Sequence, residues 1–189
     1  IFEDLGGVIW IGTDWGGINK FDPGKNMFRH QFYEPNRINA LNSNMIRSFH
    51  KKGNVLWIGT KEGGVNLYNT DTREYRYIKH DPDNSNSLSN NTVRDILEDR
   101  SGAVWLGTQW GLNRYNPETG RFKHYFYDRN NPGATHVLCM HEDKEGIIWI
   151  GNYGDGLKRF DPVKETWDTY MKKVNSNSIS DNIVWDIEE

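Results

Sequence analysis

The chain has 189 residues, a formal net charge of -3 at pH 7 and 13% aromatic residues. This charge argues against a nucleic-acid partner, which normally needs a clustered basic surface. No apolar run approaches the ~20 residues that span a bilayer, so direct membrane insertion of this chain is not expected either. Cys139 is its only cysteine, which excludes an internal disulfide.

A tryptophan-glycine motif occurs four times along the chain, at 10–13, 57–60, 105–108 and 149–152. Successive copies are separated by about 44 to 48 residues, a period that is typical of one β-propeller blade per repeat. Because the tryptophan recurs in every unit, we expect the indoles to pack between neighbouring blades rather than to stack on a ligand. These structural tryptophans are Trp10, Trp57, Trp105 and Trp149.

Each repeat predicts four short strands joined by tight turns. An acidic turn ending in glycine precedes the tryptophan, although the second copy, at 51–54, has lost the acids. A glycine hairpin follows, with one glycine fewer in the third copy, and then a strand with period-2 alternation. An Asx-Pro turn in most copies and a fourth strand with one aromatic residue complete the unit. In the third repeat the expected strands lie around 92–98, 103–108, 112–116 and 121–126.

This pattern predicts an all-β fold, a β-propeller portion of four four-stranded antiparallel blades that is a partial ring or a fragment of a larger propeller. The blades are expected approximately at 1–43, 44–90, 91–134 and 135–181. Residues 182–189 would begin the first strand of a next blade or close the ring. The sequence therefore looks like a section of a longer array.

The two terminal blades of such a section each expose one sheet face. Three arrangements are open: a tight four-bladed ring, a larger ring made from two copies, or an open arc capped by other protein. Self-association with another copy is the favoured expectation.

Residues that break the repeat are candidates for ligand binding, because the fold does not require them. Trp15 and Trp110 occupy a hairpin tip, and Tyr153 lies just before the equivalent position of the fourth copy. Aromatic side chains at loop tips can stack on sugar rings or contact a protein partner. The alternative is that they fold back over a neighbouring blade.

The first strand of each repeat carries a second set of candidates. Arg47, Arg94, Leu138 and Trp185 occupy the same position in successive copies. If this strand lines the central channel, the guanidinium groups could bind a carboxylate or a sulfate. The favoured alternative is that the arginines form ion pairs with Asp95 or other acids on adjacent strands.

Two groups of possible metal ligands do not fit a metal site. His136 and His141 flank Cys139, but positions 136 and 141 of one strand point to opposite faces. The loop at 81–92 begins like a calcium-binding EF-hand loop but lacks the glycine and the closing glutamate of that motif. No metal and no other cofactor is expected.

The stretch from Asn86 to Pro117 carries a longer motif. It combines Asn-Ser-Leu-Ser-Asn-Asn, an acidic turn, Trp-Leu-Gly-Thr and Tyr-Asn-Pro in fixed order. This motif resembles the two-component regulator propeller repeat, and the likeness covers all four units despite the lysines at 51–52 and the short hairpin at 110–111. Such repeats build the periplasmic sensor regions of hybrid two-component histidine kinases, best known from gut Bacteroidetes.

The resemblance implies two propellers of about seven blades each, a β-sandwich, one membrane span and cytoplasmic kinase parts. No kinase signature occurs in this sequence, so the chain itself is not expected to be an enzyme. The implied function is periplasmic sensing of oligosaccharides from polysaccharide breakdown.

Two alternative functions remain open. One is a scaffold or dimerisation propeller with no small-molecule ligand. The other is a carbohydrate-active propeller enzyme, because Asp99-x-x-Gly102-x-x-Trp105 is similar to the Asp-box turn of sialidase-type propellers. Against the enzyme, the acids recur with the repeat, which indicates a structural use.

Overall fold

The computed structural model describes residues 1–126, 135–174 and 177–189. These residues form sixteen strands in four four-stranded antiparallel sheets, which we call blades 1 to 4 in chain order. The described part of the chain contains no helix of the length and apolar character needed to cross a membrane. The expected all-β architecture of four antiparallel propeller blades is confirmed.

The strands of each blade follow one another in space in chain order, so every connection within a blade is an up-and-down hairpin. Blade 1 contains β1 (Phe2–Glu3), β2 (Ile9–Gly12), β3 (Ile18–Asp22) and β4 (Met27–Gln31). Blade 2 contains β5 (Ile46–Lys52), β6 (Val55–Thr60), β7 (Val65–Asn69) and β8 (Tyr75–Ile78). Blade 3 contains β9 (Val93–Glu98), β10 (Val104–Thr108), β11 (Gly111–Asn116) and β12 (Arg121–Tyr125). Blade 4 contains β13 (Val137–Glu142), β14 (Ile148–Asn152), β15 (Leu157–Asp161) and β16 (Thr166–Tyr170).

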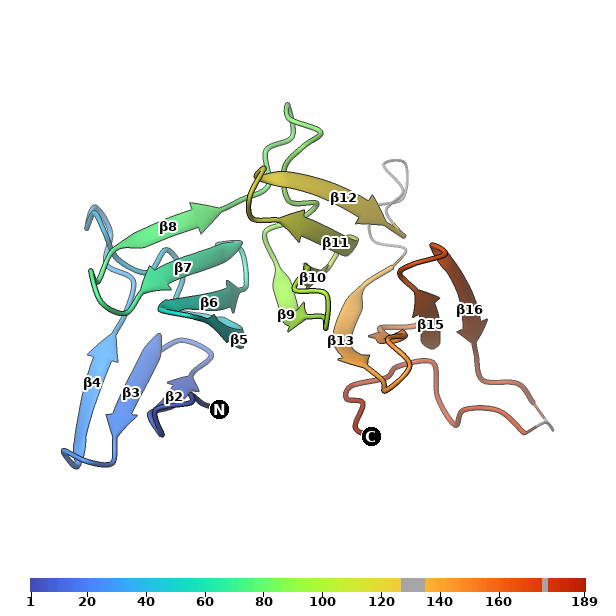
Figure 1. The fold of residues 1–189 in the computed structure, drawn as a ribbon, viewed down its shortest axis with the longest axis horizontal. Coiled ribbons are helices and arrows are strands. Elements are labelled where there is room, and N and C mark those ends of the chain that lie inside the picture. Colours follow the sequence, from blue (N-terminus) through green and yellow to red (C-terminus); the bar gives the residue numbers. More distant parts are fainter. Residues whose placement is uncertain (127–134, 175–176) are drawn as a thin grey trace.

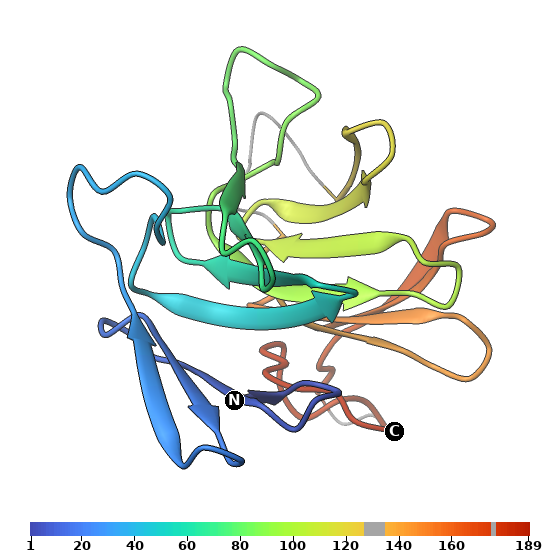
Figure 2. The same cartoon turned by 60° about the vertical axis from the view of Figure 1, so that its left-hand side comes forward.

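The four blades form an open arc. The first strands β5, β9 and β13 lie on the concave, inner side, and the fourth strands β8, β12 and β16 lie on the convex side (Figure 1). Both ends of the chain lie at the open side of the arc (Figures 1 and 2). β1 pairs with β2, and Ile183 forms an isolated antiparallel bridge with Tyr153. The described strand pairings therefore do not join the two terminal segments, and closure by another copy or by other protein stays a prediction.

Three of the four indoles of the repeated motif pack at the junctions between blades, where the sequence predicts them, and Trp149 does not. Trp105 is fully buried in a cluster with Ile150 and Phe160 of blade 4. The indoles of the first and second repeats occupy equivalent clusters against the following blade. Trp149 lies on the face of blade 4 that has no further blade against it and is only partly buried. Apolar burial between successive sheets is thus the main contribution that holds the arc together.

The acidic turn before the tryptophan holds the indole in place. Asp99 accepts hydrogen bonds from the backbone N–H groups of Ser101 and Ala103, at 2.9 and 3.0 Å. Its other carboxylate oxygen accepts the indole N–H of Trp105 at 2.7 Å. The recurring acids therefore have the structural use that the sequence indicates. The same indole-to-carboxylate bond joins Trp10 to Asp4 and Trp149 to Asp143.

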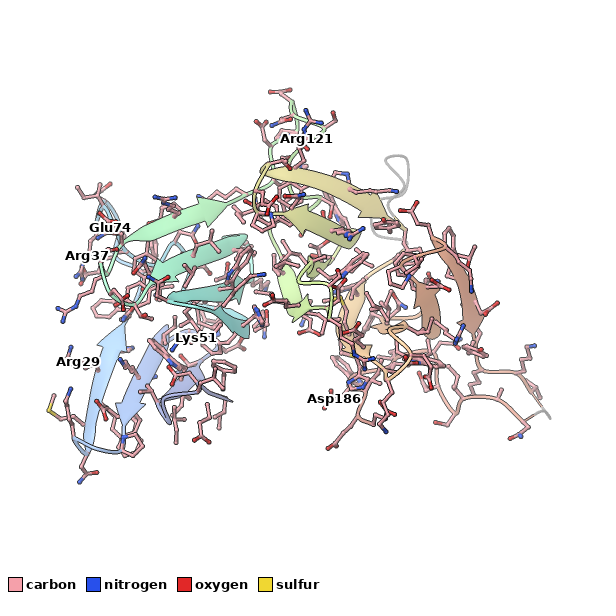
Figure 3. The ribbon with its side chains drawn as sticks, in the orientation of Figure 1. Arg29, Arg37, Lys51, Glu74, Arg121 and Asp186 are labelled. Carbon is pink, nitrogen blue, oxygen red and sulfur yellow. The ribbon has the colours of Figure 1, made fainter. Side chains whose placement is uncertain are left out.

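The second repeat, whose turn lacks acids, uses its lysines to bind both neighbouring blades. Lys51, which is labelled in Figure 3, donates to Asp4 of blade 1 at 2.9 Å. Lys52 donates to Glu98 of blade 3 at 2.5 Å and to the carbonyl of Gly102 at 3.1 Å. The lost acids are thus replaced by ion pairs across two blade junctions.

Acidification is expected to destabilise the fold as the pH falls from about 4 to about 2. Burial raises the pKa of Asp4, but the hydrogen bonds from Lys51, Trp10 and the turn outweigh burial and lower this pKa from 3.8 to about 2. As the pH falls, Asp4 is therefore protonated in the unfolded chain before it is protonated in the folded chain. The stabilisation is complete above the pKa of Asp4 in the unfolded chain, and it is lost as the pH falls through the pKa of Asp4 in the folded chain. The shift corresponds to about 2 kcal/mol.

Urea unfolding of the wild-type chain and of Asp4→Asn at about pH 6 and about pH 2.5 measures this effect. The free-energy difference between the two proteins should be large at the higher pH and small at the lower one. A difference of the same size at both values would contradict the assignment of the effect to the Asp4 carboxylate.

Candidate functional site

Each glycine hairpin attaches one blade to the start of the next. The backbone N–H of Gly64 donates to the carbonyl of Asn91 at 2.8 Å, with a φ of 71° at the glycine. This bond places the hairpin tip of a blade beside the first strand of the following blade. Equivalent bonds run from Gly17 to Asn44, from Gly111 to Thr135 and from Gly156 to Asn182.

The starts of the inner strands surround a cavity of about 320 Å³. The four equivalent residues Arg47, Arg94, Leu138 and Trp185 all line it, so the structure brings together residues from three blades and from the segment that follows blade 4. Asp186, which lines the same cavity, lies at the open side of the arc (Figure 3). We call this cavity the axial cavity.

Two guanidinium groups give the axial cavity a positive wall. Arg47 forms an ion pair with Asp14 of the blade 1 hairpin, at 3.0 Å. The Nε atoms of Arg47 and Arg94 are both buried and have no hydrogen-bond partner among the described residues. Burial, and then the nearby charge of Arg47, lowers the pKa of Arg94 from its ordinary value. Since arginine stays charged in proteins, this site holds cationic groups with unused donors.

Three ring systems lie in contact one after another, and the last of them, Trp185, lines the axial cavity. His136 lies 5.8 Å from the ring of Tyr153, and Tyr153 lies 6.3 Å from the indole of Trp185 in an edge-on arrangement. Tyr153 and Trp185 are 54% and 67% exposed, so their faces are accessible. The Nε2 atom of His136 is buried without a partner, and burial, followed by the charge of Arg94, lowers the pKa of this histidine.

Asp95 does not pair with either arginine, in contrast to the expected ion pair. One of its carboxylate oxygens accepts the backbone N–H of Met140 at 2.6 Å, and the other accepts that of Ile96 at 2.8 Å. Burial raises the pKa of Asp95. The acid that pairs with Arg47 comes instead from a hairpin tip of blade 1.

The two hairpin-tip tryptophans have different surroundings. Trp15 is 75% exposed and follows Asp14, the partner of Arg47. Trp110 is partly buried and packs edge-on against His80, with 5.6 Å between the ring centroids. Trp110 therefore lies against the connection that follows blade 2, which is the alternative that the sequence left open, and it does not line the axial cavity.

The structure separates the residues that suggested metal binding. His136 contacts Tyr153, whereas His141 lies 3.7 Å from Glu189. In the loop that resembles an EF-hand, the carboxylate of Asp81 accepts the backbone N–H of Asp83 at 3.0 Å and so stabilises a local turn. Among the described residues no group of three or more metal-binding side chains is gathered.

Sequence reasoning missed Asp14 and His136 as members of the site. The available signal was positional, because His136 comes directly before an inner strand, where other repeats have Met45 and Thr92. A larger hollow of about 830 Å³ lies beside the turn between β11 and β12. None of the unpartnered buried polar atoms found among the described residues belongs to its lining, so it is the weaker candidate for a specific site.

Two segments, residues 87–110 and 132–154, match the family model of the two-component regulator propeller. They cover the third repeat up to its hairpin and the fourth repeat up to the same point. This match agrees with the resemblance carried by the motif between residues 86 and 117. A search of curated proteins gave no significant match.

Solved structures with the same fold include the extracellular domains of two putative hybrid two-component systems from B. thetaiotaomicron. One is 25% identical over 94% of this chain with a TM-score of 0.71, and the other is 22% identical over 91% with a TM-score of 0.63. PorZ, a surface component of the type-IX secretion system of Porphyromonas gingivalis, is 15% identical over 97% with a TM-score of 0.71. The chain spans 24%, 30% and 28% of these three chains.

Proposed function

We propose that this chain belongs to the two-component regulator propeller family and is part of the periplasmic sensor region of a hybrid two-component histidine kinase. In this role it binds an oligosaccharide from polysaccharide breakdown and catalyses no reaction. The extracellular domains of two-component systems that share its fold support the role. Ligand binding would shift the relative pose of paired sensor subunits, which requires only that the ligand bind one pose more tightly than the other.

The observation that carries this proposal is the pair of exposed rings beside the axial cavity. Trp185 lines the cavity together with Arg47 and Arg94, and the ring of Tyr153 packs edge-on against the indole of Trp185. A sugar has both an apolar C–H face and polar hydroxyl groups, so it fits a site with both kinds of contact. The repeat does not require these rings, since the equivalent positions in other copies hold different residues.

A scaffold function without a small-molecule ligand is the second candidate. The free face of blade 4 carries the partly buried Trp149, and on blade 1 Phe28 is 64% exposed. At the internal junctions the equivalents of both residues face a neighbouring blade. Uncovered faces of this kind favour association with another propeller surface.

Catalysis is disfavoured by the use that the structure makes of its acids. Asp99 and Asp143 are engaged by the turns and indoles of their own repeats. A glycosidase needs two carboxyl groups that face each other across a sugar. Incubation of the chain with polysaccharides should therefore release no new reducing ends.

Calorimetric titration with a panel of neutral and charged oligosaccharides tests the sensor function. The wild-type chain should bind at least one member of the panel, and Trp185→Ala should weaken that binding about tenfold, because it removes the most exposed ring at the cavity. Trp167→Ala is the matched control, since Trp167 is 51% exposed on the outer strand β16 and does not line the axial cavity.

An equal loss of affinity in both variants would place the ligand elsewhere. If no oligosaccharide binds while the chain self-associates, the scaffold function replaces the sensor function.

A further inference from the structure

We propose that the axial cavity binds the acidic group of a carboxylated or sulfated saccharide, and that Arg94 and Arg47 hold this group. The inference rests on the proposed sensor function and names the chemical class of its ligand. It follows from three properties of the site, which are its unused donors, its charge balance and the order in which its side chains lie along the inner strands.

The donors come first. The Nε atoms of Arg47 and Arg94 are buried without a partner among the described residues. Buried polar groups in proteins are nearly always hydrogen-bonded, and leaving one unpaired is costly. Carboxylate and sulfate oxygens are the acceptors that match the planar guanidinium fork. An anionic ligand would therefore satisfy groups that the chain itself leaves unsatisfied.

The charge balance favours an anion at Arg94. Asp14 lies 3.0 Å from Arg47 and compensates that guanidinium. No ion pair is found for Arg94 among the described residues, and the nearby Arg47 and Asp14 act on it only through space. The lowered pKa values of Arg94 and His136 agree with an excess of positive charge in a desolvated place. A bound anion would relieve the repulsion between the two arginines.

Neither of the acids that line the same cavity forms an ion pair with Arg47 or Arg94 among the described residues. Asp95 is occupied by the backbone N–H groups of Ile96 and Met140. Asp186 accepts the backbone N–H of Ile187 at 2.9 Å. Both residues follow the arginine position by one residue in the sequence, and both line the axial cavity. Asp186 is exposed and is suited to accept hydrogen bonds from sugar hydroxyl groups.

The rings complete the recognition of a saccharide rather than of a bare anion. Trp185 lines the cavity directly, and the ring of Tyr153 contacts both Trp185 and His136. A volume of about 320 Å³ is small for a pocket but accommodates one or two sugar rings, with the remaining rings of a longer chain outside. The acidic group would lie at the arginines and the sugar ring against the indole.

The test uses the wild-type chain with four probes: digalacturonic acid, a chondroitin 4-sulfate disaccharide, neutral cellobiose and sodium sulfate. Calorimetry gives the affinities, and the Nε–Hε resonances of the arginines in NMR spectra report which guanidinium groups gain a partner. We expect an acidic disaccharide to bind at least about tenfold more tightly than cellobiose and to shift the resonances of Arg94 and Arg47 in a saturable way.

Two variants and a control separate binding from folding. Arg94→Gln should lower the affinity for the acidic disaccharide about 10- to 100-fold, and Arg94→Lys, which keeps the charge but not the planar fork, should lower it less. Arg121→Gln removes the same charge from an exposed residue on the outer side of the arc, far from Asp186 in Figure 3, and should leave the affinity unchanged.

The outcomes are distinguishable. Equal binding of cellobiose and both acidic probes, unaffected by Arg94→Gln, would overturn this inference and leave the sensor function standing. Absence of binding by every sugar, neutral or acidic, would count against both. Sodium sulfate that binds as tightly as the acidic disaccharides would overturn the assignment to a saccharide.

Discussion

Replacing Trp105 with alanine is expected to destabilise the chain by about 3–5 kcal/mol, because it removes a fully buried indole from the junction of blades 3 and 4. The substitution leaves a cavity against Ile150 and Phe160 and also removes the indole N–H that Asp99 accepts at 2.7 Å. Urea unfolding at neutral pH measures the loss as a lower midpoint with an unchanged slope.

Trp149→Ala is the matched control for this substitution. Trp149 occupies the same repeat position and makes the same 2.7 Å bond, to Asp143, but it is only partly buried. The expected cost is about 1–2 kcal/mol, since less apolar surface is returned to water. Equal costs for the two variants would contradict the conclusion that packing against a following blade, rather than the hydrogen bond, gives the indole its stabilising effect.

Gly64→Ala is expected to cost about 2–4 kcal/mol, for two reasons that act together. Its φ of 71° lies in the region that residues with a side chain rarely adopt, and an added Cβ would lie 2.2 Å from the carbonyl oxygen of Ile78. That carbonyl belongs to the backbone, so it cannot move without disturbing β8. The loss should appear in the urea unfolding of the variant.

Gly53→Ala shows how much of this cost comes from conformation alone. Gly53 has a φ of 57°, but an added Cβ would meet nothing within 4 Å. Its expected cost is about 1 kcal/mol. If Gly64→Ala were no more damaging than Gly53→Ala, the close contact between the hairpin and the fourth strand would not limit this position.

The period of the tryptophan motif predicts most of the fold, because the same side chain meets the same surroundings at each internal junction. The strands expected around 92–98 and 103–108 correspond to β9 and β10, which begin one residue later. The shorter third hairpin is also found, with Thr108 directly opposite Gly111. Local pattern and tertiary packing agree here, so sequence reasoning is sufficient.

The site was less predictable, since it depends on contacts between repeats. Equivalent positions place Arg47 and Arg94 at one cavity, and this follows from the alignment of the repeats. The partner of Arg47 does not follow from it, because Asp14 lies at a hairpin tip in another blade. Likewise, Trp15 and Trp110 occupy the same repeat position, and their surroundings differ because Trp110 packs against His80.

The lysines of the second repeat make the order of the repeats matter. Lys52 reaches Glu98, and the residue that aligns with Glu98 in the second repeat is Lys51. A tandem duplication of the second repeat would therefore bring two ammonium groups together where the chain now has an ion pair. Repeats that share one motif are thus specific to their neighbours. If such an array grows by duplication of single repeats, a duplicated second repeat would be less stable than a duplicate of a repeat with acids in its turn.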